Sequence, residues 1–382
     1  MIYLDNAATS FPKPRPVCDE VNKCMRFYCG NPGRGAHSLS MAAAEKVYEC
    51  REVAADILGC EHPENIIFTL NTTYALNMAI KGILRPGDHV IISDIEHNSV
   101  FRPIYRLADA GIITYDVFSS MTGDSRRSAV RICASIAKLI RSNTRLVICT
   151  HASNICSVTL PIKEIAAFCH RHKILFALDA AQSAGHMPID MRQMGIDILC
   201  APGHKGLLGP AGCGILALGN DISLDTLVEG GNGVNSLEGY MPDFPPERYE
   251  TGTVAVPAIA GLCEGIKVVK SMDIDNICRH EHLLYERARE RLASLKNVEL
   301  YVPEYMGSVL LFNIKNVPSD QVGRGLNERG ICARSGFHCS PLAHKTIGTP
   351  SDGAVRVSFG IYNTLSDIDA LYNAVKSISD TK

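Results

Sequence analysis

Residues 174–206 read ILFALDAAQSAGHMPIDMRQMGIDILCAPGHKG and contain two short apolar runs, each followed by a polar group that can do chemistry. The first run, Ile174 to Leu178, ends at Asp179, which is typical of a strand buried on both faces. The second run, Ile196 to Ala201, ends shortly before Lys205. The chain between them is long enough for a crossover that returns it in parallel. We therefore expect both side chains at the carboxyl edge of one sheet, where open α/β folds bind ligands.

An acid and a lysine at one sheet edge suit pyridoxal 5′-phosphate. This cofactor needs an amine that holds its aldehyde and a carboxylate that keeps its ring nitrogen protonated, so that the ring can accept the electrons of a carbanion. Lys205 and Asp179 are of the right types, Gln182 could donate a hydrogen bond to the phenolic oxygen of the ring, and His204 directly precedes the lysine. The alternative is that Asp179 caps a helix and Lys205 is a solvated loop residue, because lone charged residues mostly lie on the surface.

Strand-like and helix-like segments alternate through the first two thirds of the chain. Short apolar runs occur at residues 66–68, 89–92, 112–117, 146–150 and 214–218, and segments with helical patterns lie between them. This alternation is typical of an α/β fold with a mainly parallel sheet covered by helices. From about residue 258 a long helical stretch, up to about residue 295, begins a smaller α+β domain. We predict a large domain at residues 17–257 and a small domain formed by residues 1–16 and 258–382.

Several polar residues follow the predicted strands. Thr72 and Thr73 open a helix, where hydroxyl and unpaired N–H groups suit a phosphate, although either threonine would also serve as a plain N-cap. His97 lies just beyond the strand at 89–92, at the same edge as Asp179; a histidine there is more often a hydrogen-bonded loop residue than a catalytic one. Asn154 follows the strand at 146–150, and its amide could reach the phenolic oxygen of the cofactor or a substrate carboxylate.

One cysteine and one arginine differ from the other residues of their kind. Cys339 lies in the loop RSGFHCSPL, residues 334–342, after an imidazole and near a cation, and both would favour the thiolate. An ordinary loop cysteine is the alternative. Arg356 lies between Val355 and Val357 in a strand, where a guanidinium could bind a substrate α-carboxylate with two parallel hydrogen bonds or form a structural salt bridge.

Composition excludes several classes of function. The net charge of −2 indicates no nucleic-acid partner, and no apolar run is long enough for a membrane span. The N-terminus lacks the pattern of a signal peptide. The 15 cysteines form no C-x-x-C pair, so we expect no metal site and mostly buried, reduced thiols in a cytoplasmic protein.

Together these segments resemble the cofactor motifs of class V aminotransferases, and in particular of the cysteine desulfurases. The likeness covers nearly the whole chain and is carried by LDNAAT at residues 4–9, DAAQSAGH at 179–186 and GHKG at 203–206. The loop that ends at Cys339 is similar to that of group II members, which include selenocysteine lyase-like proteins. Phe337 departs from the pattern, because a histidine usually stands there.

The resemblance implies a role for each matching residue. Lys205 would carry pyridoxal 5′-phosphate in a type I fold, and His97 would stack on its ring and help to move protons. The loop at residues 30–37 would lie by the substrate mouth, which makes Arg34 and His37 substrate-binding candidates. The segment 248–253, with Thr253, would reach the phosphate in a neighbouring subunit, so a homodimer is expected.

The predicted activity is the conversion of L-cysteine to L-alanine with a persulfide formed on Cys339. Arg356 and Asn154 would hold the substrate carboxylate, and Lys205 would take the Cα proton. Alternatives are a selenocysteine lyase acting on L-selenocysteine, a class V aminotransferase, a kynureninase or epimerase relative, and a sulfur-relay scaffold without catalysis. A sulfur-acceptor protein is an expected partner, and the sequence does not indicate which.

Overall fold

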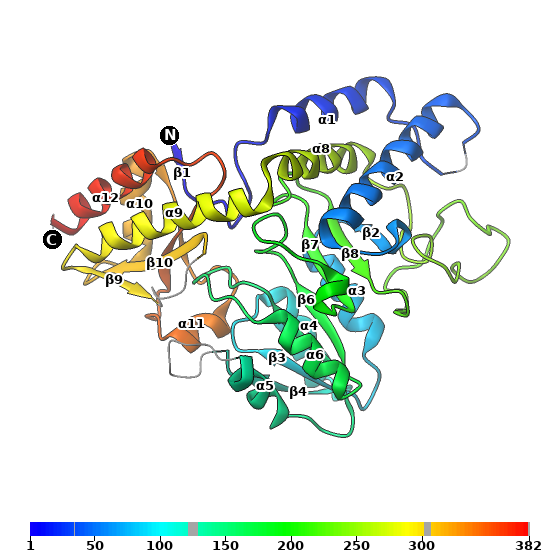
Figure 1. Cartoon of the computed structure of the whole chain (residues 1–382), viewed down its shortest axis with the longest axis horizontal. Coiled ribbons are helices and arrows are strands. Elements are labelled where there is room, and N and C mark those ends of the chain that lie inside the picture. Colours follow the sequence, from blue (N-terminus) through cyan, green and yellow to red (C-terminus); the bar gives the residue numbers. More distant parts are fainter. Residues whose placement is uncertain (34, 121–128, 302–306, 381–382) are drawn as a thin grey trace.

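The computed structural model describes residues 1–33, 35–120, 129–301 and 307–380. Its main layer is a seven-stranded sheet with the order β2-β8-β7-β6-β5-β3-β4 (Figure 1). Strands β4, β3, β5, β6 and β7 run parallel to one another, and β8 is antiparallel to both of its neighbours. The predicted α/β class is confirmed. The strands are β2 (Ile66–Thr69), β3 (His89–Ser93), β4 (Thr114–Phe118), β5 (Thr144–Thr150), β6 (Leu175–Asp179), β7 (Ile198–Pro202) and β8 (Gly214–Leu218).

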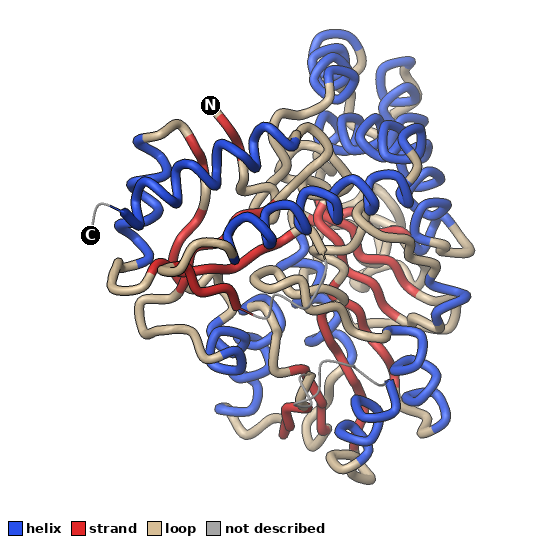
Figure 2. The backbone as a smooth tube through the Cα atoms, turned by 60° about the vertical axis from the view of Figure 1, so that its left-hand side comes forward, coloured by secondary structure: helices blue, strands red, loops and turns tan. Residues whose placement is uncertain are grey.

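Helices cover both faces of this sheet, as Figure 2 shows. Because successive strand residues point to opposite faces, Val147 and Cys149 pack with α2, α6 and α8, whereas Leu146 and Ile148 pack with α3 and α4. The helices of this part are α1 (Arg15–Phe27), α2 (Ser38–Leu58), the 3₁₀ turn η1 (Pro63–Asn65), α3 (Thr72–Ile83), α4 (Asn98–Asp109), α5 (Ala129–Ala137), α6 (Ile162–Arg171), α7 (Met191–Met194) and α8 (Val256–Met272).

A second, antiparallel sheet has the order β12-β13-β10-β9 and its own apolar core. Leu4 belongs to this core, and β1 pairs with β11, so the N-terminal segment joins the smaller part of the molecule. The elements are β1 (Ile2–Tyr3), α9 (Ile274–Ala293), β9 (Val298–Tyr301), β10 (Val309–Ile314), α10 (Ser319–Glu328), β11 (Ile331–Cys332), β12 (Arg334–Gly336), α11 (Pro341–Ile347), β13 (Ala354–Ser358) and α12 (Leu365–Asp380).

The helical stretch predicted from about 258 to 295 consists of two helices, α8 and α9. The chain breaks at Asp273, whose φ of 67° is left-handed and whose carboxylate accepts a hydrogen bond from the N–H of Asp275 at 3.0 Å. Helix α8 packs in the core of the large sheet and α9 in that of the small sheet. The domain boundary at residue 257 stays a prediction, and we propose moving it to Asp273.

All fifteen cysteines lie in the described residues and are free, and most are buried. Among the described helices, none combines the length and the apolar character that a bilayer crossing requires.

Candidate active site

A cavity of about 220 Å³ lies where the carboxyl ends of the parallel strands meet the small sheet. Asp179 ends β6, Lys205 follows β7, Cys339 follows β12 and Arg356 lies within β13, and all four line this cavity. The alternative is that Asp179 caps a helix and Lys205 is a solvated loop residue; instead Asp179 is buried, Lys205 is partly buried, and both line the cavity. Six further predicted residues line the same cavity: Thr72, Thr73, His97, Asn154, Gln182 and His204.

Burial raises the pKa of the acid and lowers the pKa of the amine, so the two values come closer together. It raises the pKa of the Asp179 carboxyl from 3.8 to about 6, against a hydrogen bond from the N–H of Ala181 and the charge of Lys205. Burial lowers the pKa of the Lys205 amine from 10.5 to about 8, and the charge of Asp179 opposes this shift. The amine is therefore far more often neutral than an exposed lysine, as a nucleophile toward an aldehyde must be.

His97 is the N-cap of α4 and a neutral ring. Its Nδ1 accepts a hydrogen bond from the N–H of Ser99 at 3.1 Å, so the ring proton lies on Nε2. Burial, followed by the charge of Lys205, lowers the pKa of His97 to about 4. The hydroxyls of Ser99 and Thr73 lie 2.7 Å apart beside it. His97 can therefore contact a ring in the cavity without adding positive charge.

Thr72 has a buried hydroxyl that forms no hydrogen bond in the described part of the chain. The N-cap of α3 is Asn71, whose side chain accepts from the N–H of Tyr74 at 3.0 Å, so the reading of Thr72 or Thr73 as the cap is wrong. A free donor at a helix N-terminus is what a phosphate group requires. Together with the amine of Lys205 and the acid of Asp179, these donors fit pyridoxal 5′-phosphate.

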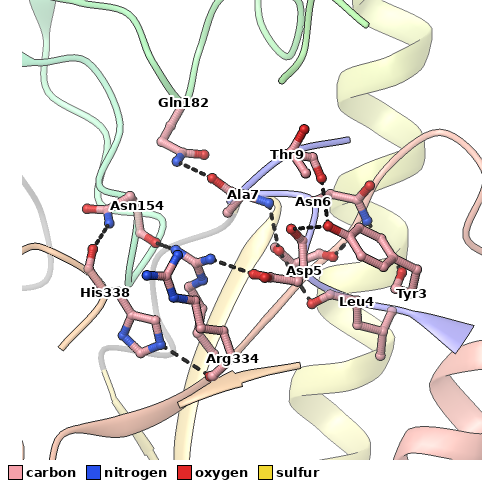
Figure 3. A network of polar contacts seen from close by, with 12 residues as sticks. Tyr3, Leu4, Asp5, Asn6, Ala7, Thr9, Asn154, Gln182, Arg334 and His338 are labelled. Atoms are coloured by element: carbon pink, nitrogen blue, oxygen red, sulfur yellow. Dashed lines mark hydrogen bonds and ion pairs between the residues drawn. The ribbon is translucent and has the colours of Figure 1, made fainter. Parts of the chain in front are cut away.

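The side chains of Gln182 and His204 contact the N-terminal segment. Gln182 donates from Nε2 to the carbonyl of Ala7 at 2.9 Å (Figure 3). The Nδ1 of His204 lies 3.0 Å from the hydroxyl of Thr9, and burial lowers the pKa of His204 to about 4. The amide nitrogen that we expected at the phenolic oxygen of the cofactor thus already binds a backbone oxygen, and only its second hydrogen is available.

Arg356 is both an ion-pair partner and a wall of the cavity. Its Nη2 donates to Oδ1 of Asp5 at 2.6 Å and its Nη1 donates to the backbone oxygen of Asn154 at 3.0 Å. Its buried Nε has no partner among the described residues. The two readings of Arg356 are therefore compatible, since the structural ion pair leaves N–H groups for a substrate carboxylate.

Cys339 is exposed, and its loop is shaped by its neighbours. The backbone N–H of Asn98 donates to the carbonyl of Cys339 at 2.8 Å. His338 donates from Nε2 to the carbonyl of Arg334 at 3.2 Å, its Nδ1 lies 3.2 Å from Nε2 of His344, and burial lowers its pKa to about 3. The imidazole that we expected to favour the thiolate is neutral and occupied at both nitrogens, so it cannot stabilise the Cys339 thiolate by charge.

Two predicted residues, His37 and Thr253, do not line this cavity, and a third cannot be placed. His37 is the N-cap of α2, with its ring accepting from the N–H of Ser40 at 3.3 Å, and its role in substrate binding stays a prediction. Thr253 lines a separate depression of about 810 Å³ with Asn31 and Phe244. Arg34 lies outside the described residues.

Sequence reasoning gave no role to Asp5, Glu96 or Ser340. Asp5 belongs to the LDNAAT motif, and Glu96 directly precedes His97, so both carried a signal. Glu96 is fully buried and accepts from the N–H of Thr150 at 2.9 Å, and burial raises its pKa to about 8. The only sequence signal for Ser340 was its position directly after Cys339.

A lysine, an acid and free donors at the carboxyl edge of a mainly parallel sheet are features of a known class of protein. The chain belongs to the class V aminotransferase family, whose model matches residues 2–371. A probable cysteine desulfurase of Methanothermobacter thermautotrophicus is 35% identical over 386 residues, which cover 99% of this chain and 94% of that protein. The apo structure of a cysteine desulfurase from Thermococcus onnurineus NA1 matches with a TM-score of 0.88 and 30% identity, over 100% of this chain and 95% of the other. The structure of a cysteine desulfurase from Escherichia coli matches with a TM-score of 0.89 and 26% identity, over 99% of this chain and 94% of the other.

Proposed function

We propose that this chain is a pyridoxal 5′-phosphate-dependent cysteine desulfurase that converts L-cysteine to L-alanine and forms a persulfide on Cys339. The observation that carries the proposal is the shared cavity, which Lys205, Asp179, Arg356 and Cys339 all line. Relatives that match nearly the whole chain have the name of this activity, which supports the same conclusion.

The cofactor, when bound, supplies an acceptor for the electron pair left at the substrate Cα. Lys205 would hold its aldehyde, Asp179 would face its ring nitrogen and His97 would lie against the ring. Thr72 and Thr73 would hold the phosphate, because both stand at the N-terminus of α3.

Arg356 would receive the substrate carboxylate through its free N–H groups, and Lys205 would take the Cα proton. The thiolate sulfur of Cys339 then forms a bond to the substrate sulfur while the bond from that sulfur to Cβ breaks. The electron pair of the broken bond stays with Cβ, which takes a proton and becomes the methyl group of alanine, and Lys205 would return a proton to Cα. The two sulfurs that become joined are each formally oxidised by one electron and Cβ is reduced by two, so no outside oxidant is needed, and a thiol or an acceptor protein would remove the sulfur.

The rival functions use fewer of these groups. A transaminase needs Lys205 and Asp179 but has no use for Cys339, and a sulfur-relay scaffold has no use for Lys205. A selenocysteine lyase would use the same cavity with L-selenocysteine, but the related proteins carry the name cysteine desulfurase, which does not favour it.

We also propose that a second copy of the chain covers the surface formed by α1, α2 and the loop at 228–244. Thr253 and the depression of about 810 Å³ lie on this side and not in the Lys205 cavity, so Thr253 could contribute to the cofactor site only in a partner. Many large apolar side chains are exposed there, as an obligate dimer requires. They are Met25, Phe27, Leu39, Met41, Val228, Tyr240 and Phe244.

The test is the Cys339→Ala variant, assayed for alanine from cysteine, cysteine sulfinate and selenocysteine. We expect alanine from cysteine to fall by about a hundredfold or more, while the visible absorbance of the bound cofactor stays and still disappears on borohydride treatment. Cys60→Ala, which removes a thiol outside the cavity, should behave like the native protein. Full alanine production from cysteine in Cys339→Ala would refute the proposal.

A further inference from the structure

One side chain holds the Cys339 loop on both sides of the thiol. Asn154 donates from Nδ2 to the carbonyl of His338 at 2.8 Å, as Figure 3 shows. Its Oδ1 accepts from the hydroxyl of Ser340 at 2.6 Å. His338, Asn154 and Ser340 are all buried. The residue before Cys339 and the residue after it are therefore fixed to the same amide group.

The backbone of Asn154 is also bound to the cation of the cavity. Its carbonyl oxygen accepts from Nη1 of Arg356 at 3.0 Å. Asn154 follows β5 of the large sheet, whereas the Cys339 loop and Arg356 belong to the small one. A single residue of the large part therefore contacts both the guanidinium that would bind the carboxylate and the loop that carries the sulfur.

The loop needs such support because its backbone is unfavourable. His338 and Cys339 have φ angles of 50° and 59°, in the left-handed region that residues with a Cβ rarely adopt. Hydrogen bonds to the carbonyls of both residues, from Asn154 and from the N–H of Asn98, hold them there. Without the bonds from Asn154 we expect the loop to relax, and the direction of the thiol would change.

We propose that Asn154 is a positioning residue that fixes the distance between the carboxylate site at Arg356 and the sulfur of Cys339. This inference rests on the proposed function, and it differs from a role of Asn154 as a substrate ligand. The thiolate has to meet one atom of a substrate whose carboxylate is held elsewhere, so its rate depends on this distance.

The experiment measures loop exchange and kinetics in the cofactor-loaded protein. Asn154→Ala removes both side-chain bonds and keeps the backbone bond to Arg356. We expect faster amide hydrogen exchange in peptides that span residues 335–342, a fall of about a hundredfold in kcat for alanine formation and a KM within about threefold of native. Ser340→Ala removes one bond and should act in the same direction by about fivefold.

Thr346→Val is the matched control. In the native protein the hydroxyl of Thr346, which lies in α11, donates to the carbonyl of Asp94 in the large part at 3.0 Å. Like the Asn154 bonds, this bond joins the two parts of the molecule, but it lies away from the cavity. The Thr346→Val variant should leave loop exchange and kinetics at native values. If Asn154→Ala does not fold, the comparison of Ser340→Ala with Thr346→Val decides.

A large rise in KM with unchanged kcat and unchanged loop exchange would overturn the inference in favour of a substrate ligand. Native behaviour of both variants would overturn it as well. If the native protein forms no alanine from cysteine, the proposed function fails, whereas the exchange of residues 335–342 in Asn154→Ala still decides whether Asn154 fixes the loop.

Discussion

The lowered pKa of Lys205 predicts how the protein takes up its cofactor. Only the neutral amine attacks an aldehyde. Burial lowers the pKa of Lys205 from 10.5 to about 8, so that about a tenth of the amines are neutral at pH 7, compared with about 0.03% for an ordinary lysine. The cavity therefore increases the reactive fraction by roughly 300-fold at this pH.

The assay is the rate at which cofactor-free protein binds pyridoxal 5′-phosphate, followed by its visible absorbance from pH 6 to pH 10. The rate should rise about tenfold per pH unit up to about pH 8 and then level off. The reaction of the cofactor with a blocked lysine under the same conditions corrects for its own ionisation. Lys205→Ala should show no such band.

The Asp179→Asn variant tests the cause of the shift. Because the charge of Asp179 raises the pKa of Lys205 against the effect of burial, its removal should move the bend in the profile below pH 8. A native rate that keeps rising tenfold per unit to pH 10 would refute the reasoning, since Lys205 would then be an ordinary lysine. A bend that moves upward in Asp179→Asn would refute the assigned role of the carboxylate.

Two ion pairs give predictions on stability, both measured by urea unfolding. Asp5→Ala leaves the buried guanidinium of Arg356 without its carboxylate and should lower the free energy of unfolding by about 3 kcal/mol; Asp5→Asn, which keeps an oxygen acceptor, should lose less, and equal losses would contradict this. The second ion pair joins His186 and Glu281, which lie 3.0 Å apart. Burial lowers the pKa of His186, but the charge of Glu281 and its hydrogen bond together raise it by more, so the net pKa is raised. The stabilisation is therefore complete below the ordinary histidine pKa of about 6.5 and is lost as pH rises through the raised value, so Glu281→Gln should cost more at pH 6 than at pH 9.

The acid and the lysine could be predicted because local patterns determine where they lie. Asp179 and Lys205 each follow an apolar run, and right-handed parallel crossovers bring the carboxyl ends of such strands to one edge. The same rule gave His97, Thr72 and Asn154 as lining residues. Cys339 needed the resemblance in addition, because a loop position alone does not indicate which way a thiol points.

The partners of the amides could not be predicted. Gln182 and Asn154 have the expected positions, but their side chains bind the carbonyls of Ala7 and His338. Any polar side chain at the edge of a sheet has several donors and acceptors within reach, and the choice among them depends on how the two parts of the molecule pack. The sequence contains no local signal for a contact between residues that are 175 or 184 positions apart.

The N-terminal segment determines how the amine and the guanidinium lie relative to each other. Asp5 binds Arg356, and the N–H of Ala7 donates to the hydroxyl of Ser358 in the same strand at 2.8 Å. On the other side, the carbonyl of Ala7 accepts from Gln182, and the N–H of Ser10 donates to the carbonyl of His204 at 3.1 Å, directly before Lys205. A displacement of β13 relative to the Lys205 turn must break some of these bonds or carry the whole segment along. Any closure of the small part over a ligand therefore has to move residues 5–10 as well, and substitutions in this segment should affect the cofactor site although only Ala7 and Ala8 line it.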